Sequence, residues 1–556
     1  MSTTSAIVLD RLIAWGVDRI FGLIGDGINP LLEALRQRQD RIRFIAVRHE
    51  EAAGFMACAH AKYTGKLGVC LATSGPGALH LPNSLYDAAF DRAPVLAITG
   101  MPVHDLLGTQ YKQDVDTVAL FREVAKFNVM LNGPRQAQTV VDLACRSALG
   151  TFSVAHLAIP RDIQELELEE DEPSKKSAHL SGTTIWMPRR ETPAREQVEA
   201  AAKLLNEAER PMILAGRGAL GAGDVLQQVA ENLGAPIAKA LLGRACIGDD
   251  SAYTTGNIGD LGTLPSKQAA EECDALLICG SNMPYLQYYP KPGQARAIQI
   301  DRDPQSMGLR HPVEIGLVGD VRMTLEALLP LLPRRSDRSF LTLCQQRVKD
   351  WNDTLDRVES ERATPLKPQF VVAAVSRCLT NDAMISLDTG ALTIFCGRHL
   401  RVKDTHSLAV SGTLASMGVG LPYALAAKLA YPDRLSVALA GDGGFTMTMG
   451  DLITAVKYKL AVKVVIFKNN SLAMDAWEQK EAGTPEFGAE LHPIDFVRFA
   501  EACGVEGYRC TQPDEVEPAL RRAFGSSGPS VVEMHIDAKE WPVKPQDVGQ
   551  PAGSQE

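Results

Sequence analysis

Short apolar runs alternate with helical periodicity along most of the chain. Near the N-terminus, apolar runs at 43–47, 68–72 and 94–99 predict strands, and the stretches 50–63 and from about residue 78 predict helices. Further strands are expected at 211–216, 275–279, 297–301, 383–387, 435–440 and 462–467, with a helix over 224–233. Strands that alternate with helices favour parallel sheets covered by helices on both faces. We therefore expect an α/β fold of doubly wound parallel sheets.

Two stretches rich in charge, serine and proline interrupt this alternation, at about 165–195 and 333–367. Such composition is typical of linkers between domains. A chain of 556 residues is long enough for about three to four domains of roughly 150 residues each. The expected division is three α/β domains over 1–170, 190–335 and 360–540, followed by a polar tail over 541–556.

The composition is that of an ordinary globular protein, with 45% hydrophobic and 22% charged residues. The net charge of −10 and the absence of a long basic run argue against nucleic acid or an anionic membrane as a main partner. The eleven cysteines form no C-x-x-C pair, and several lie in apolar runs, which fits buried thiols in a reducing compartment. No signal peptide is recognisable, and the uncharged window 408–427 contains too many glycines and hydroxyls for a spanning helix. We expect a cytoplasmic protein and interpret 408–427 as a buried turn that leads into a buried helix.

Several predicted strands end in loops that combine glycine with small or acidic residues. In open α/β sheets ligands bind at the carboxyl ends of the strands, so these loops are the first places to look for chemistry. They are residues 25–27, 73–77, 216–218 and 441–444.

The loop Gly216-x-Gly218-x-x-Gly221 matches the dinucleotide-binding fingerprint in its letters. The next predicted strand, near 236–241, lacks the acidic residue that would hold the ribose of NAD. An NAD-dependent dehydrogenase is therefore disfavoured. The free N–H groups of such a loop can still hold a diphosphate, and a tight turn without a ligand is the plain alternative.

Asp442 and Asn469 end two successive predicted strands, 27 positions apart. Neighbouring parallel strands would place these two oxygen donors side by side, and Mg²⁺ prefers oxygen ligands that it shares with phosphates. Gly441, Gly443 and Gly444 would let backbone N–H groups approach a diphosphate closely. Taken alone, the same residues could simply form turns.

This Gly-Asp-Gly and Asn pattern resembles the thiamine diphosphate fingerprint. The segment 48–57 in turn resembles the N-terminal signature of the pyruvate oxidase and acetolactate synthase superfamily, whose catalytic Glu directly follows a His. The resemblance makes Glu50, rather than Glu51, the candidate catalytic residue. Its carboxylate would hydrogen-bond the aminopyrimidine ring, so that the cofactor's own imino group can remove the weakly acidic thiazolium proton. Without the resemblance, both acids are favourable residues in the first turn of a helix.

The resemblance covers nearly the whole chain, in the order pyrimidine-binding, middle and diphosphate-binding domain. It implies Mg²⁺ ligation by Asp442, Asn469 and the carbonyl of Ser471, and it makes Gln113 an active-site residue. The cofactor contacts that it implies are Gly390, Ala415, Ser416, Met417, Gly441, Gly443, Gly444, Leu472, Ala473 and Met474. In this superfamily the cofactor lies between the first domain of one subunit and the third domain of another. At least a homodimer, and commonly a homotetramer, is therefore implied.

Several segments look most like flavin-dependent pyruvate oxidase and quinone-linked pyruvate dehydrogenase. They are residues 74–81, 120–123, 280–285, 299–304 and 441–451. This likeness implies FAD in the middle domain, with the Gly216 loop and Asp301 beside its diphosphate and ribose. Because middle domains of the superfamily do not always bind flavin, FAD remains an open expectation. Quinone-linked relatives use an amphipathic C-terminal extension, whereas residues 546–556 are polar, so membrane attachment is disfavoured.

The chain departs from the family pattern at three positions. Lys468 takes the place of the first Asn of the usual pair. Ala473 replaces the usual Gly, which adds a methyl group and disfavours positive φ. Asp475, six positions after Asn469, stands where oxidases and synthases have Val or Ile and non-oxidative decarboxylases have a Glu that relays protons.

His104, which precedes Asp105, partly resembles the histidine motif of those decarboxylases. Asp26, His104 and Asp475 could therefore form a proton relay. A carboxylate facing the carbanion-like enamine would favour protonation and aldehyde release over electron transfer to flavin. The plain alternative places Asp475 and His104 at the surface.

The leading hypothesis is a thiamine diphosphate- and Mg²⁺-dependent enzyme that decarboxylates a 2-oxo acid such as pyruvate and oxidises the product through flavin. Carboligation, as in acetolactate synthase, and non-oxidative aldehyde release are the alternatives. All three share Glu50, Asp442 and Asn469. A catalytically silent relative that only binds a nucleotide is the alternative from a different class.

Overall fold

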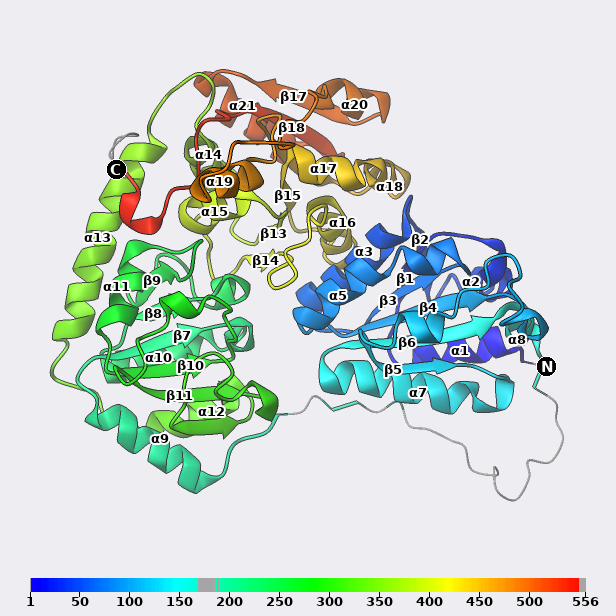
Figure 1. Cartoon of the computed structure of the whole chain (residues 1–556), viewed down its shortest axis with the longest axis horizontal. Helices are drawn as coiled ribbons and strands as arrows, with labels where there is room; N and C mark the ends of the chain where they lie inside the picture. Colours follow the sequence, from blue (N-terminus) through cyan, green and yellow to red (C-terminus); the bar gives the residue numbers. More distant parts are fainter. Residues whose placement is uncertain (1, 169–183, 185, 188–189, 550–556) are drawn as a thin grey trace.

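The computed structural model describes residues 2–168, 184, 186–187 and 190–549. It contains three six-stranded sheets, each with all its strands parallel and with helices packed around it (Figure 1). This arrangement confirms the predicted α/β fold of three doubly wound sheets. The predicted linker at 165–195 falls largely outside the described residues.

The first sheet has the strand order β2-β1-β3-β4-β6-β5. Its strands are β1 Arg19–Gly22, β2 Arg43–Ala46, β3 Gly68–Ala72, β4 Val95–Met101, β5 Ala125–Met130 and β6 Val154–Pro160. Its helices are α1 Thr4–Ala14, α2 Asn29–Arg36, α3 Glu50–Thr64, α4 Pro76–Leu79, α5 Pro82–Phe90, α6 Thr117–Leu120, α7 Pro134–Thr151 and α8 Arg161–Glu165. The predicted strand at 68–72 coincides with β3, and the predicted helix 50–63 is α3.

The second sheet has the order β12-β11-β10-β7-β8-β9. Its strands are β7 Pro211–Ala215, β8 Ile237–Lys239, β9 Thr254–Asn257, β10 Ala275–Cys279, β11 Arg296–Asp301 and β12 Ile315–Val318. Its helices are α9 Arg195–Glu207, α10 Gly223–Leu233, α11 Leu264–Glu272 and α12 Val321–Leu328.

The third sheet has the order β14-β13-β15-β16-β18-β17. Its strands are β13 Met384–Leu387, β14 Ser407–Ala409, β15 Ser436–Gly441, β16 Val462–Lys468, β17 Glu506–Cys510 and β18 Ser530–His535. Its helices are α14 Pro368–Cys378, α15 Ala391–His399, α16 Gly420–Ala430, α17 Asp442–Thr448, α18 Leu452–Lys457, α19 Ala473–Glu481, α20 Phe496–Ala502 and α21 Pro513–Gly525. The predicted buried turn and helix at 408–427 correspond to the segment that leads into α16, whose side chains are mostly buried. Among the described residues, no helix is long and apolar enough to cross a membrane.

The charge-rich stretch 333–367 is not an irregular linker, because most of it forms the helix α13, Ser339–Glu359. Its charged residues face outward, while an apolar stripe at helical spacing is buried. The stripe consists of Phe340, Leu341, Cys344, Trp351 and Leu355. Figure 1 shows α13 along the outer side of the middle domain, and it packs against α11 there and against α14 of the third domain.

The first and third domains share one hydrophobic core, in which α3 packs against α5 of its own domain and against α16 of the third (Figure 1). A buried polar cluster lies within this interface. The Lys62 Nζ atom donates to Asp87 at 3.2 Å, Asp91 at 2.7 Å, the Tyr423 hydroxyl at 2.7 Å and the Val410 carbonyl at 2.9 Å. One lysine thus joins two carboxylates of the first domain to two groups of the third.

Candidate active site

The Asp442 and Asn469 loops lie side by side, as predicted, because β15 and β16 are neighbouring parallel strands. Asp442 is the first residue of α17, and Asn469 directly follows β16. The Asp442 carboxylate accepts the N–H of Asn470 at 2.7 Å and that of Gly443 at 3.1 Å. The two loops therefore form one rim at the carboxyl end of the third sheet.

The Asp442 carboxylate is buried, with only 5% of the residue exposed. Burial raises its pKa above the ordinary value, against the opposing effect of the N–H groups of Asn470 and Gly443. Within the described part of the chain it forms no ion pair. A buried carboxylate without a cationic partner is a site where a bound cation would be strongly stabilising. The side-chain oxygen of Asn469, which accepts the N–H of Ser471 at 3.0 Å, adds the kind of ligand that Mg²⁺ prefers.

Close packing explains two glycines of this rim and brings two predicted cofactor contacts together. A Cβ atom on Gly443 would lie 2.8 Å from Leu472 Cδ2 and 3.5 Å from Met417 Cε. A Cβ atom on Gly444 would lie 3.0 Å from the Asp388 carboxylate. Met417 and Leu472 therefore flank the start of α17, where the resemblance places the cofactor.

Other predicted cofactor contacts line more open parts of the same rim. A Cβ atom on Gly390 or Gly441 would meet no atom within 4 Å, so space remains beside both. Ala415 has a positive φ of 59°. The Ser416 hydroxyl accepts a hydrogen bond from Asn83 Nδ2 at 2.9 Å, which links this segment to the first domain.

Asp388 is a site residue that the sequence analysis missed. Its buried carboxylate accepts N–H groups of Thr389 at 2.8 Å, Gly418 at 2.8 Å and Gly420 at 3.3 Å. Burial raises its pKa to about 6, although these hydrogen bonds act in the opposite direction. The signal was available, because Asp388 follows a buried strand and precedes a glycine at 390, much as Asp442 precedes Gly443.

The structure accounts for two of the three departures from the family pattern. Lys468 ends β16 and is buried, with Nζ 3.3 Å from a Glu533 carboxylate oxygen, so it serves the core rather than the ligand loop. Ala473 begins α19, and the positive φ of this loop, 56°, falls on Asn470 instead. The extra methyl group therefore causes no backbone strain.

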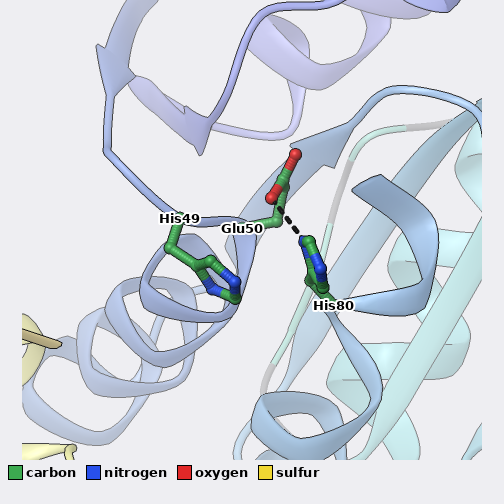
Figure 2. Close-up of side chains that lie close together, drawn as sticks. All are labelled: His49, Glu50 and His80. Atoms are coloured by element: carbon green, nitrogen blue, oxygen red, sulfur yellow. Dashed lines mark hydrogen bonds and ion pairs between the residues drawn. The ribbon is translucent and has the colours of Figure 1, made fainter. Parts of the chain in front are cut away.

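Glu50, the predicted catalytic residue, lies apart from the Asp442 rim, at the carboxyl end of the first sheet. Glu50 is the first residue of α3 and is only 5% exposed. Its Oε2 atom lies 2.9 Å from His80 Nδ1, and the His49 ring packs beside the His80 ring with centroids 4.3 Å apart (Figure 2). Glu51, by contrast, accepts a hydrogen bond from Asn83 Nδ2 at 2.6 Å. Burial and orientation thus single out Glu50, while neither histidine contact was predicted.

Gln113 joins the loops around Glu50. It has a positive φ of 64°, and its side-chain oxygen accepts the Ser74 hydroxyl at 2.7 Å. The neighbouring Thr73 hydroxyl accepts the Gly27 N–H at 3.1 Å. A Cβ atom on Gly77 would lie 3.1 Å from Glu50 Oε1. The predicted loops 25–27 and 73–77 therefore meet at one edge, with Gln113 and Glu50.

The residues of the predicted proton relay are not in contact with one another. His104 is exposed and pairs with Asp162, which raises its pKa, and its Nε2 atom lies 2.9 Å from Asp105. Asp26 is exposed on the same edge of the first sheet. Asp475 is exposed in the first turn of α19, next to Met474, and forms no hydrogen bond or ion pair with described residues. The proton relay of Asp26, His104 and Asp475 therefore stays a prediction, and none of the contacts described for these residues supports it.

Within one chain, Glu50 and its described neighbours form no direct contact with Asp442 or Asn469. The start of α3 contacts the third domain at Asp451, whose carboxylate accepts the Arg48 N–H at 3.0 Å. No hydrogen bond or ion pair among the described residues joins Glu50 to Asp442 or Asn469.

The glycine loop of the middle domain is used for packing. The N–H groups of Gly216 and Gly218 donate to the carbonyls of Cys279 at 2.9 Å and Gly280 at 3.0 Å. A Cβ atom on Gly216 would lie 2.4 Å from the Gly280 carbonyl. These two N–H groups are therefore not available to a diphosphate, so this part of the expected flavin or nucleotide site does not fit the group.

Two further observations concern the nucleotide hypotheses. The strand β8 ends in Lys239, a buried cation paired with Asp249 at 2.6 Å, where an NAD site would need an acid. Asp301, expected beside a flavin ribose, accepts Arg92 Nη1 at 2.9 Å. This ion pair joins the middle domain to the first.

Three family models match the chain. They are the thiamine pyrophosphate enzyme N-terminal TPP binding domain over residues 2–120, the central domain over 198–328, and the C-terminal TPP binding domain over 388–534. Thiamine pyrophosphate is another name for thiamine diphosphate. The matched segments contain the second sheet in full. They leave out β5 and β6 of the first sheet, and β13 and the final residue of β18 of the third.

Curated relatives match over nearly the full length. YdaP of Bacillus subtilis, whose name describes it as a thiamine pyrophosphate-containing protein, is 38% identical over 96% of this chain and 92% of the length of YdaP. The pyruvate oxidase of Lactiplantibacillus plantarum is 33% identical over 93% of this chain and 85% of its own. The probable acetolactate synthase large subunit of Methanococcus aeolicus is 30% identical over 95% and 91%.

Proposed function

The chain belongs to the thiamine pyrophosphate enzyme family, and on that basis we propose that it uses thiamine diphosphate and Mg²⁺ to decarboxylate a 2-oxo acid such as pyruvate. The observation that carries this proposal is the buried Asp442 carboxylate beside the Asn469 loop, which forms no ion pair with a described side chain. A relative named pyruvate oxidase supports pyruvate as the substrate. The direct test is release of CO₂ from pyruvate by purified protein, with and without thiamine diphosphate and Mg²⁺.

In this proposal each half of the site has its own task. Asp442, Asn469 and the Ser471 carbonyl would hold Mg²⁺, and the open backbone at Gly441 would leave room for the diphosphate. Glu50 would exchange a proton with the aminopyrimidine ring, and its contact with His80 Nδ1 would orient the carboxylate. When bound, thiamine diphosphate supplies an electron sink for the carbanion left by decarboxylation.

Removing the Asp442 carboxylate tests the metal half. We expect Asp442→Asn to weaken Mg²⁺-dependent binding of thiamine diphosphate by at least about 10-fold, because a neutral amide is a poorer ligand for a hard cation. Calorimetric titration with cofactor and Mg²⁺ measures the change. Asp475→Asn is the matched control, since Asp475 is an exposed acid of the same domain and should leave cofactor affinity unchanged. Equal cofactor affinity in Asp442→Asn and wild type would contradict the assignment.

We further propose that the active enzyme is at least a homodimer, and in its full form a homotetramer, with each cofactor held between Glu50 of one subunit and Asp442 of another. The lack of contact between these residues within one chain supports this arrangement. Glu50→Gln and Asp442→Asn subunits, each inactive alone, are expected to regain activity when mixed under subunit exchange. Statistical mixing of a dimer restores about a quarter of the sites. If the mixture stays inactive although mixed dimers form, the shared site is wrong.

Oxidation through flavin is a second candidate, favoured by the relative named pyruvate oxidase. The N–H groups of Gly216 and Gly218 already donate to backbone carbonyls, which counts against a diphosphate on that loop. The proposed mechanism therefore includes no flavin step. The visible absorption spectrum of protein purified without added cofactor decides between the candidates. Flavin absorption that pyruvate bleaches would support oxidation. Colourless protein that forms acetolactate would support carboligation, and release of aldehyde would support non-oxidative decarboxylation.

A further inference from the structure

His49, Glu50 and His80 form a compact group of metal-ligating side chains outside the Asp442 rim. One ligand atom from each residue lies within 4.8 Å of the others. Figure 2 shows the Glu50 carboxylate directed at His80, with His49 beside them at the start of α3. Two of the residues are neighbours in sequence, and the third comes from the loop between α4 and α5.

The donor set of this group differs from that of the Asp442 rim. Two imidazole nitrogens and one carboxylate oxygen suit Zn²⁺ and similar first-row cations, which accept nitrogen ligands readily. Mg²⁺ requires oxygen ligands in near-octahedral geometry and would not select such a set. The two groups therefore distinguish between divalent cations.

The geometry leaves the ligands free to converge. His80 is 44% exposed at its side chain, so its ring can turn, whereas the Glu50 side chain at the start of α3 is only 6% exposed. His49 Nδ1 accepts only a long hydrogen bond from the Glu51 N–H, 3.3 Å, which leaves Nε2 for a ligand. The only ionisable group that the Glu50 carboxylate contacts among the described residues is His80, at 2.9 Å, so no fixed positive charge competes with a metal ion.

We propose that His49, Glu50 and His80 bind a borderline divalent cation such as Zn²⁺, and that this ion inhibits the enzyme by withdrawing Glu50 from the cofactor. The second part rests on the proposed function, because it requires Glu50 to act on thiamine diphosphate. A carboxylate bound to Zn²⁺ cannot exchange a proton with the aminopyrimidine ring. Zn²⁺ at this site and the productively bound cofactor therefore exclude each other.

Metal binding is tested without any activity measurement. Untagged full-length protein is freed of metal and cofactor and titrated with Co²⁺, whose visible absorption reports nitrogen and oxygen ligation, and with Zn²⁺ in a calorimeter. We expect one ion per chain. His49→Gln and His80→Gln should each weaken Zn²⁺ binding by at least about 10-fold and reduce the Co²⁺ absorption. Circular dichroism establishes that each variant is folded.

His535→Gln is the matched control. His535 also contacts a glutamate, Glu533, but no third ligand joins them in the described part of the chain. This variant should bind Zn²⁺ like the wild type. If His49→Gln and His80→Gln bind as tightly as His535→Gln, the proposed site is wrong, whatever the enzyme catalyses.

A second measurement tests the inhibition. Wild-type protein loaded with Zn²⁺ before the cofactor should lose turnover, and a prior excess of thiamine diphosphate and Mg²⁺ should protect it and suppress the Co²⁺ absorption. Protection that depends on the order of addition supports a shared Glu50. A Co²⁺ site that persists unchanged in the fully active holoenzyme would overturn the inhibition. Failure of the proposed function itself would appear differently, as a protein without turnover whose Co²⁺ absorption still requires both histidines.

Discussion

Replacement of Glu50 by glutamine is expected to lower turnover of the 2-oxo acid by about 10²- to 10⁴-fold. Glutamine has nearly the same shape but cannot exchange a proton with the aminopyrimidine ring. Because Glu50 begins α3 in the first domain, far along the chain from the predicted metal ligands of the third, the variant should still bind thiamine diphosphate and Mg²⁺. Steady-state CO₂ release and calorimetric titration with the cofactor measure the two properties separately.

Glu51→Gln is the control for this variant. The substitution is chemically the same, one residue along the same helix, but Glu51 bonds Asn83 instead of lying against His80. It should turn over substrate at close to the wild-type rate. If Glu50→Gln kept full activity on every accepted substrate, the thiamine mechanism would have to be abandoned. If both variants lost activity equally, the loss would reflect the helix start rather than one carboxylate.

The parts of the site that the sequence predicts are those fixed by strand order. Asp442 and Asn469 could be placed together because each ends a strand, and successive strands of a doubly wound sheet are commonly neighbours. The predicted strand at 275–279 coincides with β10 for a related reason, since a fully buried parallel strand is a short continuous apolar run. The local sequence pattern is sufficient to predict a site where strands follow one another in the order usual for a doubly wound sheet.

The parts that the sequence does not predict depend on loop conformation. His80 contacts Glu50 across 30 positions and directly follows the short helix α4, Pro76–Leu79, so the contact depends on how this connection between β3 and α5 is folded. The burial of Lys468 against Glu533 likewise depends on β18 lying next to β16, which no local pattern indicates. Long-range pairs of this kind require the tertiary structure.

The helix α13 shows that the composition of a segment can conceal a helix. Its charged residues dominate the composition of 333–367 and favour a linker, yet its buried stripe of Phe340, Leu341, Cys344, Trp351 and Leu355 follows helical spacing. Average composition over a window hides such a stripe, whereas periodicity reveals it. Residue order was therefore a better guide here than residue content.

Replacement of Lys62 by methionine is expected to destabilise the folded chain by about 3–5 kcal/mol, because it leaves two buried carboxylates without their cation. Burial alone would lower the pKa of Lys62, but Asp87 and Asp91 raise it above its ordinary value, so the lysine is charged in the folded protein. The same lysine lowers the pKa of Asp91, against the raising effect of burial. Since the cluster joins α3 to α16, the loss should weaken the contact between the first and third domains.

Thermal unfolding and urea unfolding, followed by circular dichroism, measure the effect of Lys62→Met. Lys66→Met is the control, because Lys66 lies just past the end of the same helix and is exposed, and surface substitutions usually change stability by no more than about 0.5 kcal/mol. A second comparison isolates the charge. The double variant Lys62→Met with Asp91→Asn removes one of the two carboxylates that would otherwise be buried without a cation, and it should recover part of the lost stability. If Lys62→Met unfolded like Lys66→Met, the cluster would not stabilise the interface, and the shared apolar core of α3, α5 and α16 would hold the two domains together by itself.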